Sequence, residues 1–289
     1  NYGFPWGAPH FAIHSGRYLQ AENTTMFNIF NKKEKSVNKT ERKPKTILCI
    51  PGNWNDRTEI VTAIAENNTN DFIFAGMILL NLKTNKGFEL EICDRDDRMK
   101  DSFKYAGMVN QVSDEFLAEI DKHKYVIYLS AETGNLESAT EIAKAGNAIL
   151  KSGGIGIKVE TAGKAFTKEH WIELLTDFEE SNLYEMFVLD SIANEQGQIY
   201  SCGMHNLGLK DTIVVGEEFD DSITLMKSFN YFILIDKPNL KENHTFSPSE
   251  EWPTFKITKE NNQPNKEQEL LENQYGMWKL EKKPAGNTV

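Results

Sequence analysis

The sequence predicts an α+β protein made of two pseudo-repeated halves, each a split βαβ (ferredoxin-like) unit with an antiparallel sheet, bridged by a helix. Three observations lead to this prediction. Residues 46–130 show the order strand, helix, strand, strand, helix, strand. A helical pattern over residues 136–151 follows, and a similar order of elements returns from residue 155 onward.

In the first half, the β-rich run Thr46–Ile50 ends at the turn residues Pro51 and Gly52. Asp56 and Glu59 have the spacing of a capping box, with Asp as the cap, and predict a helix that reaches about Asn67. A long apolar run predicts a strand at 72–82, and period-two alternation predicts a strand at 88–92. A helix at 113–122 and a strand at 125–130 complete this half.

A connecting helix is expected from Leu136 to about Lys151, because its apolar residues form one stripe and Gly153-Gly154 ends it. In the second half, Thr167 and Asp220 are expected to cap two helices. The strands expected in this half lie at 155–159, 183–192, 197–203 and 231–235, with a further strand at 254–257 and a final one around 275–280.

Two segments of the chain also align with each other. Residues 114–129 match residues 220–235 in their acidic start, in the core pair Leu117 and Ile223, and in the pair Tyr125 and Tyr231. This similarity predicts an internal duplication. The expected division is a flexible extension with a basic linker at 1–45, a first half at 46–135, a bridging helix at 136–154, a second half at 155–258 and a polar tail at 259–289.

The predicted core combines apolar residues from every expected strand and helix. Its members are Ile47, Ile50, Ile64, Phe74, Ile78, Leu90, Leu117, Ile127, Leu129, Ile142, Leu175, Val188, Ile199 and Ile233.

Charge and apolar patterning exclude several classes of protein. The net charge of the 289 residues is −11, with +5 in residues 1–45 and −16 in the remainder, so a non-specific nucleic-acid binder is not expected. The longest apolar run, Phe72–Leu80, is about half of the ~20 residues that a membrane span needs. Three widely spaced cysteines and the lack of a signal-peptide pattern favour the cytoplasm. Residues 1–25 show no periodicity and are read as foreign to the natural chain or as a docking peptide.

Few residues have the pattern of a catalytic or metal site. Cys202 and His205 form half of a metal-binding pattern, but no second Cys/His cluster accompanies them, so neither a metal nor another cofactor is expected. His170, Cys202, His205 and Asp190 are the candidates for acid, base or nucleophile in an enzyme, and no spacing selects among them. A buried, unreactive cysteine is the simpler interpretation of Cys202.

Two other groups are candidates for binding. The acidic cluster Glu89, Glu91, Asp94, Asp96 and Asp97 could hold a cation, but Glu89 and Glu91 alternate with apolar residues in the manner of a solvated strand face. Trp54 follows the turn at Pro51-Gly52 and is a candidate aromatic anchor for a partner, or else it folds back over its own helix.

The segment Cys202-Gly-Met-His-Asn-Leu-Gly-Leu-Lys, with the helix from Asp220 and the sequence Leu240-x-x-x-x-Thr-Phe246, resembles the bacterial domain-of-unknown-function 4261 family. The resemblance covers roughly residues 197–250, and Glu242-Asn243-His244 stands where the family has Asp-Gly. It implies a cytoplasmic bacterial protein and assigns no catalytic residue.

Two functions remain open. The favoured one is a non-enzymatic protein-binding module, of the immunity or adaptor type, for a basic protein. Residues 160–195 contain nine acidic residues and two lysines, and Glu173, Asp177, Glu179 and Glu180 are the expected contacts together with Trp54. The alternative is a small-molecule hydrolase or transferase with its site in the cleft between the halves.

Overall fold

The computed structural model describes residues 43–266 and 268–283. Of the predicted extension and linker, residues 1–42 therefore lie outside the described part. The described residues form two β-sheets with helices packed on them, which confirms the predicted α+β class.

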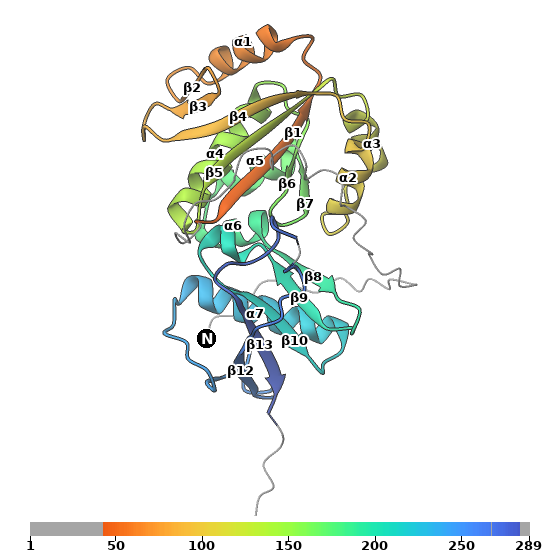
Figure 1. Ribbon diagram of the computed structural model, residues 1–289, viewed down its shortest axis with the longest axis vertical. Helices are drawn as coiled ribbons and strands as arrows, with labels where there is room; N and C mark the ends of the chain where they lie inside the picture. Colours follow the sequence, from red (N-terminus) through yellow and green to blue (C-terminus); the bar gives the residue numbers. More distant parts are fainter. Residues whose placement is uncertain (1–42, 267, 284–289) are drawn as a thin grey trace, which may run out of the picture. The chain divides into compact units, whose positions relative to one another are not determined.

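The first sheet is antiparallel throughout and has the strand order β2-β3-β4-β5-β1-β6-β7 (Figure 1). Its seven strands are β1 (Lys45–Gly52), β2 (Phe72–Ala75), β3 (Ile78–Asn81), β4 (Gly87–Asp94), β5 (Tyr125–Glu132), β6 (Gly156–Val159) and β7 (Lys164–Thr167).

Helices cover both faces of this sheet. Neighbouring residues of β1 show the two faces, because Leu48 and Ile50 pack in one apolar cluster while Ile47 and Cys49 pack in another. The first cluster includes residues of α1 (Arg57–Asn67), α4 (Leu136–Lys151) and α5 (Lys168–Thr176). The second includes residues of α2 (Met99–Ala106) and α3 (Asp114–Ile120).

The second sheet has the order β11-β12-β13-β10-β9-β8, and its central pair β10 and β13 is parallel. Its strands are β8 (Leu189–Ala193), β9 (Ile199–Cys202), β10 (Asp211–Val215), β11 (Thr245–Phe246), β12 (Phe255–Glu260) and β13 (Met277–Lys282). The helix α7 (Phe219–Ile235) packs on it, and the 3₁₀ helix η2 (Met204–Leu207) connects β9 to β10. The helix α6 (Glu180–Phe187) packs against α7 and η2.

Capping residues explain why the helices begin where they do. The side chains of Asp56, Ser113, Asn135 and Thr167 each accept a hydrogen bond from a backbone N–H in the first turn of the helix that follows. The predicted caps Asp56 and Thr167 are thus confirmed, as is the helix at 136–151. The predicted cap Asp220 is wrong, because α7 begins at Phe219 and its N-cap residue is Glu218.

Three predicted strands are different in the structure. Residues 231–235 form the last turns of α7, where Ile233 is buried with Phe229 one turn earlier. Residues 183–192 form most of α6 followed by β8, and residues 72–82 form the hairpin of β2 and β3 around Gly76, whose φ is +69°. A short apolar run does not distinguish a buried helical turn from a strand, which is the physical reason for the first two errors. In the third, the apolar run continues through the turn at Gly76 and so hides the division into two strands.

The internal duplication is not confirmed. The two sheets differ in strand number, strand order and direction of pairing. In addition, β6 and β7, which belong to the predicted second half, extend the first sheet beside β1. Of the predicted core residues, Ile78 is 40% exposed because it lies on the open face of β3.

Candidate functional site

The prediction that Trp54 is an exposed aromatic anchor for a partner is wrong. Its side chain is 3% exposed, and its indole Nε1 donates a hydrogen bond of 2.6 Å to the backbone oxygen of Ser152. The ring lies against Gly52 and Gly153, where an added Cβ would come within 2.2 Å and 2.7 Å of indole atoms. Two glycines therefore make room for the ring, and Trp54 fastens the start of α1 to the end of α4.

Cys202 and His205 lie in the segment 202–211, from the end of β9 to the start of β10, which we call the joint segment because it packs against the first sheet. Cys202 is fully buried, and burial raises the pKa of its thiol well above the ordinary value. A thiol held in its protonated form is a poor nucleophile. His205 is 4% exposed, and burial lowers its pKa to about 4, so the imidazole is neutral at physiological pH.

Asn206 makes the contacts that define the joint segment. Its side-chain oxygen accepts hydrogen bonds from Thr46 of β1 at 2.7 Å and from Thr161, which follows β6, at 2.9 Å. Its backbone oxygen accepts a hydrogen bond from the N–H of Gly134 at 3.1 Å. All of these groups come from the end of the first sheet, so the segment between β9 and β10 is docked on that sheet.

Asp211 is the buried carboxylate of the joint segment. It accepts hydrogen bonds from Asn273 Nδ2 at 2.7 Å, from the N–H of Met204 at 3.1 Å and from Ser201 Oγ at 3.2 Å. These donors favour the ionised form, but complete burial outweighs them and raises the pKa of Asp211 to about 7. Cys202 and His205, which form half of a metal-binding pattern in the sequence, thus lie in a structural joint. Among the described residues, no group of three or more His, Cys, Asp or Glu side chains is placed to hold a metal ion.

Asp190 belongs to a different buried network, centred on Lys164 of β7. Lys164 is 3% exposed, and its Nζ donates to the backbone oxygen of Glu185 at 2.6 Å and lies 3.6 Å from that residue's carboxylate. Asp190 accepts a hydrogen bond of 3.0 Å from Tyr184 and lies 3.7 Å from Lys227 Nζ. Burial lowers the pKa of Lys164 and raises that of Asp190.

His170 lies at the border of this network. Its half-buried ring packs edge-on against Phe166 with 5.3 Å between ring centroids, and burial followed by the charge of Lys164 lowers its pKa. The charge of Lys164 thus influences the pKa of both His170 and Asp190, whereas Cys202 and His205 lie in the joint segment. Because the polar groups around Lys164 bond to one another, the network is suited to fastening β7, α6 and α7 together.

The predicted contact residues Glu173, Asp177, Glu179 and Glu180 are all exposed, and they lie at the end of α5 and the start of α6. With Glu169 we call them the acidic face. Glu180 pairs with Lys237 at 3.4 Å, while the other four form no ion pair within the described part of the chain.

Glu169, Glu173 and Asp177 follow each other at intervals of four residues, so they lie along one side of α5. Like charges at this spacing destabilise a helix by about 0.2–0.5 kcal/mol per pair. Asp177 is also the C-cap residue, and the last turn of α5 contains no basic side chain. Glu173 and Asp177 therefore add to the negative end of the helix dipole instead of compensating it, whereas Glu169 lies in the first turn, where a carboxylate is favourable.

The acidic residues of β4 and the loop after it are largely engaged with cations. Glu89 accepts a hydrogen bond from Lys45 at 2.7 Å, which lowers the pKa of Glu89. Asp96 pairs with Arg98 at 2.9 Å, and Asp97 pairs with Arg95 at 2.8 Å. This arrangement is that of a solvated surface, in agreement with the simpler interpretation of the sequence.

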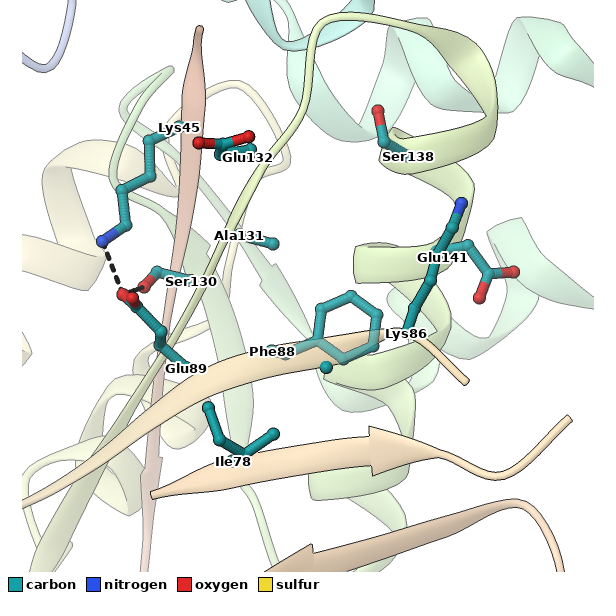
Figure 2. A pocket seen from close by; sticks show the side chains of 11 residues that line it. Lys45, Ile78, Lys86, Phe88, Glu89, Ser130, Ala131, Glu132, Ser138 and Glu141 are labelled. Carbon is teal, nitrogen blue, oxygen red and sulfur yellow. Dashed lines mark hydrogen bonds and ion pairs between the residues drawn. The ribbon is translucent and has the colours of Figure 1, made fainter. Parts of the chain in front are cut away.

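The sequence did not reveal a cavity of about 560 Å³ bounded by β4, β5 and the first turns of α4 (Figure 2). Glu141 of α4 lines it and is only 7% exposed. One signal was present: Glu141 shares its helix side with Ala145 and Ala148, four and seven residues later, and both alanines are buried. A carboxylate on the same helix side as buried alanines indicates that the carboxylate itself is buried, where it needs compensating partners.

Among the residues that the structure describes, no helix combines the length and the apolar character that a membrane crossing requires. Comparison of the chain with protein-family models, with curated proteins and with solved structures gave no match.

Proposed function

We propose that this protein is a non-enzymatic binding module of the immunity or adaptor type, which works in the bacterial cytoplasm and binds a basic protein through the acidic face. As part of this proposal, residues 197–250 are related to the bacterial domain-of-unknown-function 4261 family. The observation that carries the proposal is the row of Glu169, Glu173 and Asp177 along α5, where no described cation pairs with them.

The argument is energetic. Repulsion along the row and the unfavourable end of the helix dipole both cost folding free energy, each on the order of a few tenths of a kcal/mol. Glu179 and Glu180 at the start of α6 are favourably placed for their own helix, yet they add to the same negative field. A positively charged partner would turn this repulsion into attraction on binding, and it would be steered towards the face from a distance.

Charge reversal tests the role of the acidic face. In the triple variant Glu173→Lys, Glu179→Lys and Glu180→Lys, we expect the association rate with the partner to fall by about tenfold or more at low salt. We also expect the rate to become nearly independent of ionic strength, because exposed charges act over a Debye length of ~8 Å at physiological salt. Stopped-flow or surface-based kinetics, on the partner that co-purifies with the native protein, measures both quantities.

A matched control keeps the total charge change equal. Glu250, Glu251 and Glu272 are exposed and form no ion pair among the described residues, so their triple reversal to Lys changes the net charge by the same amount elsewhere. This control should change the association rate by less than about twofold. Equal rates for the two triple variants would show that the acidic face is only a solvated surface.

A further inference from the structure

The strands β4 and β5 separate at one end of the first sheet. Their pairing runs from Asp94 and Tyr125 to Glu89 and Ser130, where it stops. Both strands continue beyond that point, but only on their outer sides: Gly87 and Phe88 still pair with β3, and residues 131–132 still pair with β1. The inner edges of β4 and β5 therefore diverge without a ladder between them, and Figure 2 shows the gap.

The cavity of about 560 Å³ fills this gap, and its size lies in the ~300–1,000 Å³ range of ligand pockets. Lys45, Glu89 and Ser130 lie on one side of the strands, while Ser138 and Glu141 of α4 lie on the other (Figure 2). A group that enters between the strands from the sheet surface therefore meets the helix at the back of the cavity.

Glu141 is the unusual residue at the back. Among the described residues, its side chain accepts hydrogen bonds at one oxygen only, Oε2, from Asn81 at 3.1 Å and from Thr84 at 2.8 Å. No cation within the described ranges lies at ion-pair distance from it. The two lysines of the cavity are engaged elsewhere, because Lys45 pairs with Glu89 at 2.7 Å and Lys86 pairs with Glu137 at 2.7 Å.

Buried carboxylates in proteins are normally paired with a cation or a set of donors, because an uncompensated charge in the interior is costly. Asn81 and Thr84 are neutral donors and share one oxygen of Glu141, so Oε1 has no hydrogen-bond partner among the described residues. Glu141 also lines the cavity. The missing partner of this carboxylate is thus a cationic group that the cavity can admit.

We propose that the gap between β4 and β5 binds an extended peptide segment of a partner protein and takes one lysine side chain, whose ammonium group pairs with Glu141. A lysine suits the site because its apolar stem can pass Phe88 and Ala131, which line the cavity, before the charge reaches the helix. The extended backbone of the segment would pair with the free inner edges of the two strands, as in β-strand addition. This site is distinct from the acidic face and does not depend on it.

A blocked pentapeptide tests the proposal, with the sequence threonine, valine, lysine, valine, threonine, an acetylated amino end and an amidated carboxyl end. It is titrated into the full chain labelled with ¹⁵N. We expect saturable shifts of the amide signals of Gly87, Phe88, Ala131 and Glu132. A peptide with norleucine in place of lysine keeps the stem but loses the charge, and it should bind at least about tenfold more weakly.

The matched protein variants are Glu141→Gln and Glu137→Gln. A glutamine at 141 can still accept the hydrogen bonds of Asn81 and Thr84 but has no charge, so the lysine peptide should bind at least about tenfold more weakly. Glu137 lies on the same helix, is exposed and does not line the cavity, so its variant should bind within about twofold of the parent. Thermal melting checks folding, and Glu141→Gln should melt at the parent's temperature or higher.

Each possible result decides the proposal. Loss of binding with both norleucine and Glu141→Gln, together with shifts at the strand edges, supports it. Equal binding of the lysine and norleucine peptides, unchanged binding by Glu141→Gln, or no shift at these amides overturns it. A peptide with N-methylated valines tests the backbone pairing, and its unchanged affinity would overturn the extended mode of binding.

Discussion

At the scale of single residues, the joint segment contains two buried titratable groups, Asp211 and His205. Their pKa shifts make the stability of the fold depend on pH in opposite directions. Burial raises the pKa of Asp211 from 3.8 to about 7 and lowers that of His205 from 6.5 to about 4. Both shifts favour the neutral form, which is the expected result of removing a charge from water. As a result, rising pH weakens the fold through Asp211, whereas falling pH weakens it through His205.

Asp211→Asn isolates the first effect. In the parent protein, the raised pKa means that the folded state holds its proton more tightly than the unfolded state does. The stabilising contribution is complete below about pH 4 and is lost as the pH rises to about 7, by about 4 kcal/mol at most. Asparagine does not titrate, so the variant should gain stability relative to the parent across this window.

Urea unfolding of both proteins at several pH values between 4 and 8 measures the difference. His205 is present in both, so its own titration cancels from the comparison. A difference in unfolding free energy that stays constant over this range would show that Asp211 keeps an ordinary pKa.

Residues also show where sequence reasoning reaches its limit. The roles of Trp54 and Glu141 depend on partners far away in sequence, which local patterns do not identify. These partners are Gly153 and Ser152 for Trp54, and Asn81 and Thr84 for Glu141. The exposure of the acidic face, by contrast, could be predicted, because charged residues on a short helix stay in water unless they are paired.

At the scale of elements, capping residues predict correctly where two helices begin, whereas short apolar runs do not predict correctly whether a segment is a helix or a strand. Asp56 and Thr167 cap their helices as expected, since a cap is a contact over three residues. The apolar run Tyr231–Ile235 predicts a strand, but in the structure it continues a helix that begins at Phe219 and packs against β10. The placement of β6 and β7 beside β1 depends in the same way on contacts between distant segments.

Two glycines with the same backbone conformation allow a prediction for the joint segment. Gly208 and Gly197 have φ angles of +80° and +74°, so an alanine is strained at both. A Cβ at 208 would also lie 2.2 Å from the backbone oxygen of Gly134, whereas a Cβ at 197 meets nothing within 4 Å. We expect Gly197→Ala to cost about 1 kcal/mol and Gly208→Ala about 3 kcal/mol or more.

Chemical unfolding of the two variants measures these costs, and the difference between them reports the close contact alone. Equal costs would mean that the joint segment moves away from Gly134 without loss of stability, and the contact would then not fasten the two sheets.

At the scale of the whole molecule, the two sheets share one apolar core. A single contiguous cluster includes Leu48 and Ile50 of the first sheet together with Val214 and Leu280 of the second. The polar contacts of Asn206 with Thr46 and Thr161 lie at the same junction. A division into two independent halves is therefore not how the described residues are packed, and both sheets should unfold together.

Tryptophans in the two sheets report on this cooperativity. Trp54 packs with the first sheet and Trp278 lies in β13 of the second, and both are nearly buried. With 5-fluorotryptophan incorporated, ¹⁹F NMR during urea unfolding should give the same midpoint for both residues. Asn206→Ala removes the acceptor of Thr46 and Thr161 and the donor to the backbone oxygen of Gly203. Thr46 keeps Thr133 as a partner, but the buried hydroxyl of Thr161 is left unsatisfied, so the variant should cost about 3 kcal/mol. Because the core is shared, both midpoints should fall by the same amount. If the Trp278 signal shifted alone, or if the two midpoints already differed in the parent, the sheets would be separate folding units and the joint a contact between them.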